Sequence, residues 1–432
     1  MNEGKIVVSV DVGTSKIVTL IAKVDDFVNV LGVSEVPSAG VRKGQIVDID
    51  ESVAAINSSL EAAERMAGYS ASHIIASIGG NHIESQNSRG VVAVAQPEGE
   101  IRETDLTRVI DAAKAVSLPS SREILHVLPR SYIVDGQEGI KDPIGMTGVR
   151  LEVDTHIISG GSTTIRNLEK AFSEVGVDVD AIVSSGYASS LAVLSDTEKE
   201  LGVVLVDIGA GTTDICIYVE GSVAYSSVLP IGARHITNDL AIGLRISLES
   251  AEKIKLFLSN PAKKSPRLEE ETLGESKPKE KTDEIDLSPL GLPEELSKVS
   301  QKTLIDGIIR PRLNEIFTMV GLEIKKSGFA GQTPSGLVIT GGGARTIGVV
   351  EAAKRMLAMP VRVGYPTNIK GIIDEVQDTS FSTVIGLATY GQRVEEQTSL
   401  PFGFALPKLP FGSFKFNKYI SKGISFLKSF LP

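Results

Sequence analysis

The apolar positions near the start of the chain predict a β-sheet with one covering helix. Three aliphatic runs separated by polar turns lie at residues 5–11, 16–23 and 27–36. Asp50 is expected to cap a helix that ends near Gly68, because apolar side chains recur there at helical spacing. The buried face of this helix is expected to comprise Val53, Ile56, Leu60 and Ala63. A further strand at 73–79 completes half of a mixed α/β domain.

The same pattern returns later in the chain. Residues 203–219 read VVLVDIGAGTTDICIYV, and residues 7–22 read VVSVDVGTSKIVTLIA. Both are an apolar strand, an Asp-x-Gly turn with small polar residues, and a second apolar strand. Asp11 and Asp207 are 207 − 11 = 196 positions apart. The repeat predicts two related α/β halves, each with a strand–turn–strand unit at its centre.

The segment between the two copies has a different pattern. Residues 83–162 contain strand-like runs around one helix near 104–116, which predicts a small α+β insertion. The strands are expected at 91–95, 123–134 and 149–159.

The second half of the chain mixes regular and irregular stretches. Residues 259–293 are charged and rich in Pro and Ser, which predicts a poorly ordered loop. Helices are expected at about 294–326 and 346–359, on either side of a strand at 337–340. Residues 393–410 contain three prolines and are expected to be a linker.

Composition removes several classes of function. The 432 residues carry 44 Lys and Arg against 54 Asp and Glu, a net charge of −10, which argues against general nucleic-acid binding. One cysteine, Cys216, excludes a disulfide framework and a Cys-based zinc site. The five histidines have no metal-like spacing. The N-terminus does not read as a secretion signal, and no apolar stretch is long enough to span a bilayer. A cytoplasmic body is therefore expected.

The two Asp-x-Gly turns are the strongest chemical signal. Glycines let backbone N–H groups approach an anion, and the neighbouring hydroxyls add donors. Asp207 ends a strand and could hold a metal ion through water, as Asp11 could in the other copy. A single turn of this kind could be a plain β-hairpin, but its repetition favours a pair of loops that clasp phosphates. There is no GxxxxGK[ST] motif, so a P-loop is excluded.

A third glycine-rich segment at 341–344 follows a strand and could approach the nucleoside, although alone it could equally be a strand–helix turn. The candidate nucleotide-binding residues in the three segments are Asp11, Gly13, Thr14, Ser15, Lys16, Asp207, Gly209, Gly211, Thr212, Thr213, Gly341, Gly342, Gly343 and Ala344.

These segments resemble the phosphate and adenosine motifs of the actin, heat-shock chaperone and sugar-kinase superfamily. Within it, the chain closely resembles the FtsA family of bacterial cell-division proteins over residues 1–392. Residues 40–48 (GVRKGQIVD), residues 143–151 (PIGMTGVRL) and His156 carry the resemblance, together with the insertion. It implies an actin-like two-lobed α/β fold of duplicated ribonuclease-H-like halves. The insertion replaces the usual small subdomain of the first lobe.

The resemblance also implies a division of the chain. The first lobe core would be 1–82 with 163–195 and 376–392, and the second 196–232 with 311–375. The remaining parts would be the insertion subdomain at 83–162, a small subdomain of the second lobe at 233–310, and a membrane-targeting helix at 411–432.

The resemblance implies ATP and Mg²⁺ as ligands and self-polymerisation. It adds Glu252 and Lys255, three apart on one helix face, as contacts to ribose or adenine, although such pairs are often only a solvated face. Hydrolysing relatives position water with Glu or Gln in the segment between the lobes, where this chain has Ser185. A Ser hydroxyl is a poor general base, so at most slow hydrolysis is expected.

The resemblance further implies a partner. The C-terminal peptide of the tubulin-like ring protein FtsZ is expected to dock on the small subdomain. Lysines on an exposed helix often serve only solubility. The candidate contacts are Lys298, Lys302, Arg310 and Arg312. Other proteins of the division machinery are expected as further partners.

The last residues, FGSFKFNKYISKGISFLKSFLP at 411–432, predict a basic amphipathic helix. After a Pro-rich linker in an acidic protein, this favours an anchor to anionic inner-membrane lipids at the division site over a helix docked on the core. The candidate membrane-binding residues are Phe416, Lys418, Tyr419, Ile420, Lys422, Ile424, Phe426, Leu427, Lys428, Phe430 and Leu431.

Two other functions stay open at this point. A pilus-assembly protein of the PilM type shares the fold and the insertion, but that family lacks its own membrane-binding tail. A sugar or acid kinase would need a general-base carboxylate facing a substrate pocket, and no such residue can be located. A chaperone is excluded, because the roughly 40 residues after 392 are too few for a peptide-binding domain.

Overall fold

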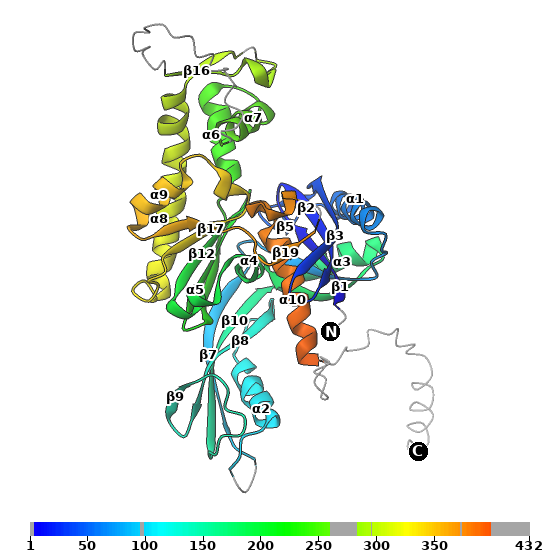
Figure 1. Ribbon diagram of the computed structural model, residues 1–432, viewed down its shortest axis with the longest axis vertical. Helices are drawn as coiled ribbons and strands as arrows, with labels where there is room; N and C mark the ends of the chain where they lie inside the picture. The colour runs from blue at the N-terminus through cyan, green and yellow to red at the C-terminus, as the bar shows by residue number, and fades with distance from the viewer. Residues whose placement is uncertain (1–3, 96–98, 260–282, 295, 372–373, 399–432) are drawn as a thin grey trace, which may run out of the picture. The chain divides into compact units, whose positions relative to one another are not determined.

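The computed structural model describes residues 4–95, 99–259, 283–294, 296–371 and 374–398 (Figure 1). Contacts divide the chain after Gln392, and the elements below belong to the part before that division, except that the last helix continues to Thr398.

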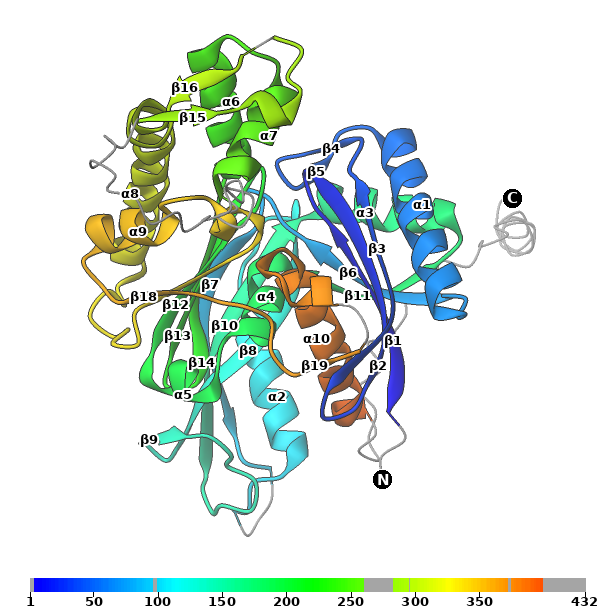
Figure 2. The same cartoon turned by 45° about the horizontal axis from the view of Figure 1, so that its top comes forward.

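Two sheets repeat one topology. The first lobe contains β1 (Lys5–Val12), β2 (Lys16–Val24), β3 (Val28–Pro37), β6 (His73–Ile78), β11 (Asp178–Ser184) and β19 (Ile369–Lys370), in the order β11-β6-β1-β2-β3-β19. The second contains β12 (Val203–Ile208), β13 (Thr213–Val219), β14 (Ser222–Leu229), β17 (Leu337–Thr340) and β18 (Val361–Val363), in the order β18-β17-β12-β13-β14. In both, the first three strands are antiparallel and the next two parallel. The predicted duplication is confirmed (Figure 2).

Each central strand is buried on both faces. Val8 and Val10 of β1 pack with α1 (Ile49–Ala67) and α3 (Ser162–Val175), whereas Val7 belongs to the core between the lobes. In β12 the same alternation sends Val204 to the outer core and Val203 to the central one. The central core also contains residues of α4 (Ser185–Val193) and α10 (Ser382–Thr398). The period of two along a strand explains this division.

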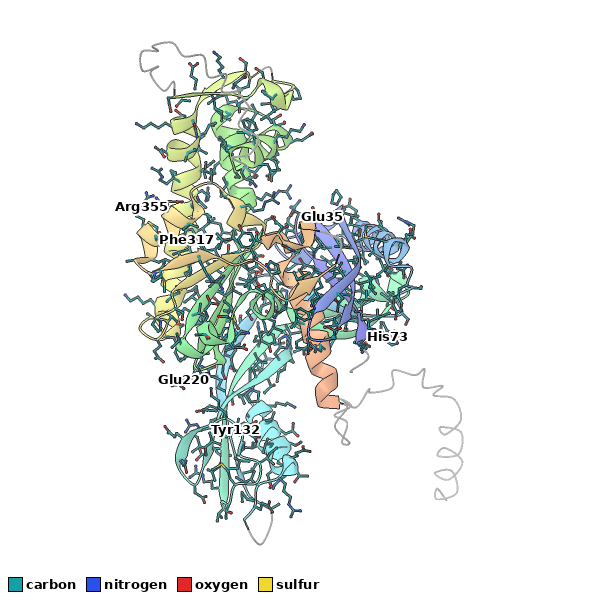
Figure 3. The ribbon with its side chains drawn as sticks, in the orientation of Figure 1. Glu35, His73, Tyr132, Glu220, Phe317 and Arg355 are labelled. Carbon is teal, nitrogen blue, oxygen red and sulfur yellow. The ribbon has the colours of Figure 1, made fainter. Side chains whose placement is uncertain are left out.

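The outer core of the second lobe is built on α8 (Arg310–Ser327) and α9 (Val349–Leu357), with α6 (Ala233–Leu244) and α7 (Leu248–Ser259) in the small subdomain. Phe317 of α8 is fully buried there (Figure 3). The remaining short helix of this region is α5 (Asp196–Leu201).

The insertion forms its own layer pair. Its sheet has the order β7-β10-β8-β9, and α2 (Glu103–Lys114) packs on β7 and β10. The strands are β7 (Glu84–Ala93), β8 (Arg122–Val134), β9 (Gln137–Ile140) and β10 (Arg150–Gly161). Although the insertion leaves and rejoins the first lobe, it also bonds to β14 of the second. The Ser85 hydroxyl donates to the Ser226 carbonyl at 2.6 Å, and the Asn87 amide to the Ala224 carbonyl at 3.2 Å.

The start of α1 differs from the prediction. The N-cap is Asp48 rather than Asp50, because Asp48 has extended backbone and its carboxylate accepts from the Glu51 N–H at 3.0 Å. The helix ends at Gly68 in the left-handed conformation, as predicted. A two-stranded hairpin precedes it, β4 (Val41–Arg42) and β5 (Gln45–Ile46).

Two predictions for the small subdomain are wrong. Residues 283–293, assigned to a poorly ordered loop, include β15 (Glu284–Asp286) and a 3-10 turn at Ser288–Leu290, because Leu287 is fully buried in the lobe core. The helix predicted from 294 begins only at Arg310. It is preceded by β16 (Lys298–Ser300), which pairs with β15, and by a π-helix, η3 (Thr303–Ile309). Pro311 lacks the N–H that a continuous α-helix would need there. Residues 260–282 lie outside the described part.

Candidate nucleotide site

The two Asp-x-Gly segments form the same turn twice. Between β1 and β2 the Gly13 N–H donates to the Lys16 carbonyl at 3.1 Å. Between β12 and β13 the Gly209 N–H donates to the Thr212 carbonyl at 2.9 Å. Each turn follows a strand that ends in the Asp-x pair, so each lobe presents an equivalent loop at the end of its central strand.

The two turns face each other across the lobes. A Cβ added to Gly211 would lie 2.8 Å from the Thr14 hydroxyl oxygen, so only glycine fits between them. The Thr14 hydroxyl in turn accepts from the Gly44 N–H at 3.0 Å. A cavity of about 100 Å³ lies between the turns, lined by both of them and by Gly341 and Gly342. The sequence-predicted segments are therefore brought together.

Gly341 and Gly342 are surrounded differently, so a side chain would be excluded at one position and accommodated at the other. Gly341 has φ +82°, and a Cβ there would lie 2.1 Å from the Asp207 carboxylate. A Cβ on Gly342 would meet only the Ser380 Cβ, at 3.9 Å. Gly341 thus permits a tight turn over Asp207, whereas Gly342 faces open space in the cleft. This segment continues as η4 (Gly342–Arg345).

A wider cleft of about 1480 Å³ adjoins the cavity, since Lys16 and Gly342 line both. Glu252 and Lys255 of α7 line this cleft and form an ion pair of 2.7 Å. The Thr237 hydroxyl of α6 joins them, donating to Glu252 at 2.5 Å and accepting from Lys255 at 2.9 Å. The predicted shared helix face is therefore present, and it faces the cleft rather than bulk solvent alone.

Three carboxyl groups gather at the small cavity between the turns. Asp11, Asp207 and Asp214 all line the small cavity. Burial raises the pKa of Asp11, while the Ser77 hydroxyl, donating at 2.6 Å, opposes that rise. Burial, with Asp11 nearby, raises the pKa of Asp207 to about 6. Burial also raises the pKa of Asp214 well above its ordinary value, and Asp207 adds to this. Desolvation therefore dominates at all three carboxyls.

Asp214 was missed as a site residue by the sequence analysis. It pairs directly with Asp207 across the β12–β13 ladder, so both side chains lie on one face of the hairpin. Its Oδ1 atom is buried and has no hydrogen-bond partner among the described residues. The antiparallel register of the repeat was the signal that could have found it. In the described part of the chain, no three acidic, His or Cys side chains are placed to hold a metal ion directly.

The segment from 378 to 383 was also missed. Ser380 and Thr383 line the small cavity, and the Thr383 hydroxyl donates to Asp207 at 3.3 Å. Asp378 and Ser380 line the wide cleft. No local motif marks these residues, because their place depends on how α10 returns to the first lobe. Ser185 lines the small cavity at the start of α4, where the sequence predicted it.

Comparison with known proteins gives the family. A family model described as "Cell division protein FtsA" matches residues 204–386, and one described as "SHS2 domain inserted in FTSA" matches residues 80–159. The cell division protein FtsA of Pseudomonas aeruginosa is 38% identical over 397 residues, covering 90% of each chain. That of Borreliella burgdorferi is 40% identical over 392 residues, covering 89% of this chain and 90% of the relative. This chain belongs to the FtsA family.

Solved structures agree on the fold of this FtsA-family chain. It is similar to the PilM–PilN type IV pilus biogenesis complex, with a TM-score of 0.63, 13% identity, and 89% of this chain and 98% of that chain covered. It is also similar to MreB5 of Spiroplasma citri bound to ADP, with a TM-score of 0.52, 12% identity, and coverage of 91% and 98%. At these identities the likeness concerns the fold, and the predicted actin-like fold with its insertion is confirmed.

Most of the residues that the FtsA-family resemblance suggested for peptide binding form ion pairs within the chain. Arg312 forms ion pairs with Asp239 and Glu315, and Arg310 one with Asp306. Lys298 lies on β16, 3.8 Å from Glu284. Lys302 lies at the start of η3 and, within the described part, forms no ion pair. The prediction that Lys298 and Lys302 share a helix is wrong, because Lys298 lies on strand β16, which ends at Ser300, and Lys302 lies at the start of η3.

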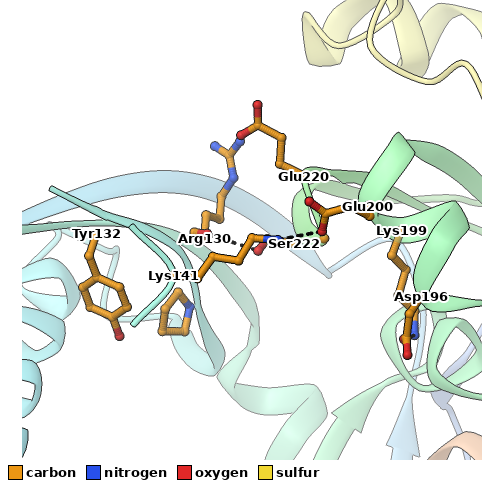
Figure 4. Close-up of a pocket in the computed structure, with 10 residues that line it drawn as sticks. Arg130, Tyr132, Lys141, Asp196, Lys199, Glu200, Glu220 and Ser222 are labelled. Atoms are coloured by element: carbon orange, nitrogen blue, oxygen red, sulfur yellow. Dashed lines mark hydrogen bonds and ion pairs between the residues drawn. The ribbon is translucent and has the colours of Figure 1, made fainter. Parts of the chain in front are cut away.

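A separate cleft of about 370 Å³ lies between the insertion and the second lobe (Figure 4). Lys141 bridges it to Glu200 of α5 at 2.7 Å, and the Ser222 hydroxyl donates to the Arg130 carbonyl at 3.2 Å. Three basic and three acidic side chains line this cleft, so it has no excess of charge for an ionic ligand. The charged lining residues are Arg130, Lys141, Lys199, Asp196, Glu200 and Glu220.

The predicted membrane-binding residues, from Phe416 to Leu431, lie outside the described residues. Among the residues that the structure describes, there is no helix with the length and apolar content that crossing a bilayer requires.

Proposed function

We propose that this chain binds ATP with Mg²⁺ between its lobes and acts as an actin-like scaffold in cell division. The single observation that carries the nucleotide site is the pair of equivalent turns, Gly13 to Lys16 and Gly209 to Thr212, facing each other across a small cavity. Backbone N–H groups in glycine-rich turns favour anions. The adjoining wide cleft, with Glu252 and Lys255 on its wall, has room for the nucleoside.

The residues fit a nucleotide with a divalent cation. Asp11, Asp207 and Asp214 would repel a triphosphate if all three were ionised without a counter-charge. A bound Mg²⁺ would supply that counter-charge. Because these carboxyls are not placed to surround an ion directly, Asp11 and Asp207 would hold it through its water shell. The unpartnered Oδ1 of Asp214 would accept from such a water.

Turnover at this site would be slow at most. Ser185 lines the small cavity. The family resemblance puts it where hydrolysing relatives have a carboxylate or amide that positions the attacking water, and a Ser hydroxyl is a weak base. The residues of the two turns and of the segment 341–344 would therefore bind and orient the nucleotide rather than drive its hydrolysis. Nucleotide binding would serve the conformation of the scaffold.

As a member of the FtsA family, the chain would polymerise and tie the FtsZ ring to the cytoplasmic face of the cell membrane at the division site. The C-terminal peptide of FtsZ would bind the small subdomain, where Lys302 is the candidate contact that remains without an ion pair in the described part. The tail at 411–432 would bind anionic lipids. Other divisome proteins would join through the same assembly.

The alternative functions are less well supported. The likeness to the PilM–PilN complex has 13% identity, whereas FtsA relatives reach 33–40%. A kinase would need a general-base carboxylate at a substrate pocket. Asp11, Asp207 and Asp214 line the same small cavity as the two turns, so they belong to the proposed phosphate site rather than to a separate substrate pocket.

The nucleotide site is tested by Gly342→Asp. Its Cβ has open space, so the fold should survive, but the carboxylate would stand beside the phosphates and should abolish ATP binding. Gly342→Ala is the matched control, because it adds only a methyl group at the same place. Calorimetric titration with ATP and Mg²⁺ measures both variants. Equal affinity of Gly342→Asp and wild type would refute the site.

The scaffold role is tested by sedimentation with anionic vesicles. FtsZ should pellet with vesicles only when this chain and ATP are present. FtsZ without its C-terminal peptide should stay in the supernatant, and pelleting of that truncated form would count against the proposed contact.

A further inference from the structure

Lys16 is the only cation of the first phosphate turn, and an acidic side chain of its own lobe holds it. Its ammonium lies 2.6 Å from the Glu35 carboxylate of β3. It also donates to the Ser380 hydroxyl at 3.0 Å and lies 4.5 Å above the Phe381 ring. An ammonium has three donors, so these contacts take up most of its capacity.

The position of this pair matters because Lys16 stands at the junction of the two cavities. It lines both the small cavity between the turns and the wide cleft, whereas Glu35 lines only the wide cleft. The side chain of Lys16 is 22% exposed and that of Glu35 is 49% exposed. A phosphate in the small cavity would therefore meet the Lys16 ammonium after the Glu35 carboxylate, on the side of the wide cleft, has already paired with it.

The contact continues across the cleft. Ser380, which accepts from Lys16, receives its own orientation from Asp378, whose carboxylate accepts from the Ser380 N–H at 3.0 Å. Asp378 in turn lies 3.6 Å from Arg345 at the end of η4. A series of polar contacts thus runs along the wide cleft from the first lobe to the second. It connects Glu35, Lys16, Ser380, Asp378 and Arg345 in that order.

We propose that Glu35 lowers the affinity for nucleotide by competing with its phosphates for the Lys16 ammonium. The proposal rests on the proposed nucleotide site. A phosphate that recruits Lys16 must displace or share the Glu35 carboxylate, and the lost ion pair reduces the net gain. Because the pair is partly exposed, the competition is modest, and it depends on the charge of the phosphates rather than on the nucleoside.

The test is Glu35→Gln, which keeps the shape of the side chain and removes its charge. Calorimetric titration should show ATP and ADP binding about 2- to 5-fold more tightly than to wild type. Adenosine has no phosphate, so its affinity should not change. The gain should shrink as salt is raised, because screening weakens the competing pair.

Two controls separate this mechanism from a general change of charge. Glu249 also lines the wide cleft but pairs with Lys253 on its own helix, at 2.9 Å. Glu249→Gln should change ATP affinity clearly less than Glu35→Gln. In the double variant with Lys16→Gln, the effect of Glu35→Gln should vanish, because the group for which the two anions compete is gone.

The outcomes are distinguishable. If wild type binds ATP and Glu35→Gln binds it with the same or lower affinity, the competition is refuted and the nucleotide site stands. If adenosine tightens as much as ATP, Glu35 acts on the shape of the cleft instead, and the proposal is wrong. If wild type binds no nucleotide, the proposed site and this inference both fail.

Discussion

Gly211 and Thr14 lie so close that a Cβ on Gly211 would stand 2.8 Å from the Thr14 hydroxyl oxygen. One residue belongs to the second lobe and the other to the first, 211 − 14 = 197 positions apart. Their close approach brings the two Asp-x-Gly turns together. The absence of a side chain at Gly211 therefore allows the two lobes to approach closely at the small cavity.

Gly211→Ala is expected to weaken ATP binding. The added methyl group would press on Thr14 and on the Lys43 backbone, which lies 3.2 Å away, and overpacking of this kind costs about 1–3 kcal/mol. The affinity should fall roughly tenfold or more. Gly331→Ala is the control, because no atom lies within 4 Å of its added Cβ. Unchanged titrations for Gly211→Ala would mean that the two turns do not act together.

Hydrolysis should be slow because Ser185 cannot act as a strong base. A phosphate-release assay with saturating ATP and Mg²⁺ should give far less than the roughly 10 s⁻¹ that is typical of enzymes. Asp214→Asn provides the comparison, since it removes the negative charge of a carboxyl group that lines the cavity and whose buried Oδ1 has no hydrogen-bond partner among the described residues. Turnover at an enzyme-like rate in wild type would contradict this prediction.

Lys302→Glu is expected to weaken binding of the FtsZ C-terminal peptide, which is partly acidic. The change reverses one exposed charge at the start of η3, so a loss of a few-fold is expected. Lys325→Glu, near the end of α8 and outside the small subdomain, gives the same change of net charge. Fluorescence anisotropy with a labelled peptide compares the two. If both variants bind as wild type does, Lys302 is not a contact.

Stability should fall below neutral pH because of His156. It is buried between Asn87, 2.7 Å from Nδ1, and Ser226, 2.9 Å from Nε2, and burial lowers its pKa to about 3. Nearby Arg130 and His126 contribute to this lowered pKa. An unfolded histidine has a pKa near 6.5, so the unfolded state takes up the proton first as pH falls. Native stability is fully present above pH 6.5 and is lost as pH falls toward the native pKa.

This effect is measured by urea unfolding at pH 7 and pH 5. One histidine that stays neutral in the native state contributes a loss of about 2 kcal/mol over this interval. Gln cannot titrate, so His156→Gln should lose correspondingly less stability between the two values, whatever its stability at pH 7. If the free energy of unfolding falls by the same amount between pH 7 and pH 5 in the variant and in wild type, His156 is not the group responsible.

The tail should place the protein on membranes. Each Lys contributes about 1 kcal/mol at an anionic surface, and each large apolar side chain roughly 1.5–3 kcal/mol at full burial. Raising salt should therefore weaken vesicle binding only in part. Phe426→Glu or Leu427→Glu should detach the protein even at low salt. Deleting 411–432 should leave a folded protein that binds ATP but does not sediment with vesicles. Sedimentation or unfolding of the truncated protein would refute the anchor.

Local sequence was sufficient for much of the fold and for the centre of the site. The repeated Asp-x-Gly turns and the glycine-rich segment at 341–344 were predicted from residues close together in the chain. The Glu252–Lys255 pair was predicted from the family resemblance, and its spacing of three residues indicated only a shared helix face. The insertion was predicted because the pattern of apolar residues changes at 83–162. The same reasoning placed one N-cap at Asp50 instead of Asp48, because the two residues are only two positions apart and the backbone conformation alone shows which of them caps the helix.

Only the tertiary structure decided which side chains meet. Asp214 became a site residue through its register with Asp207, and Ser380 reached Lys16 across 364 positions. Polar composition predicted disorder at 283–293, but the burial of Leu287 holds that segment on the lobe. The sequence by itself determined the turns, strands and helix faces, because backbone preference and apolar spacing act over a few residues. The electrostatics of the site depend on burial and on partners from distant segments, and these exist only once both lobes have packed.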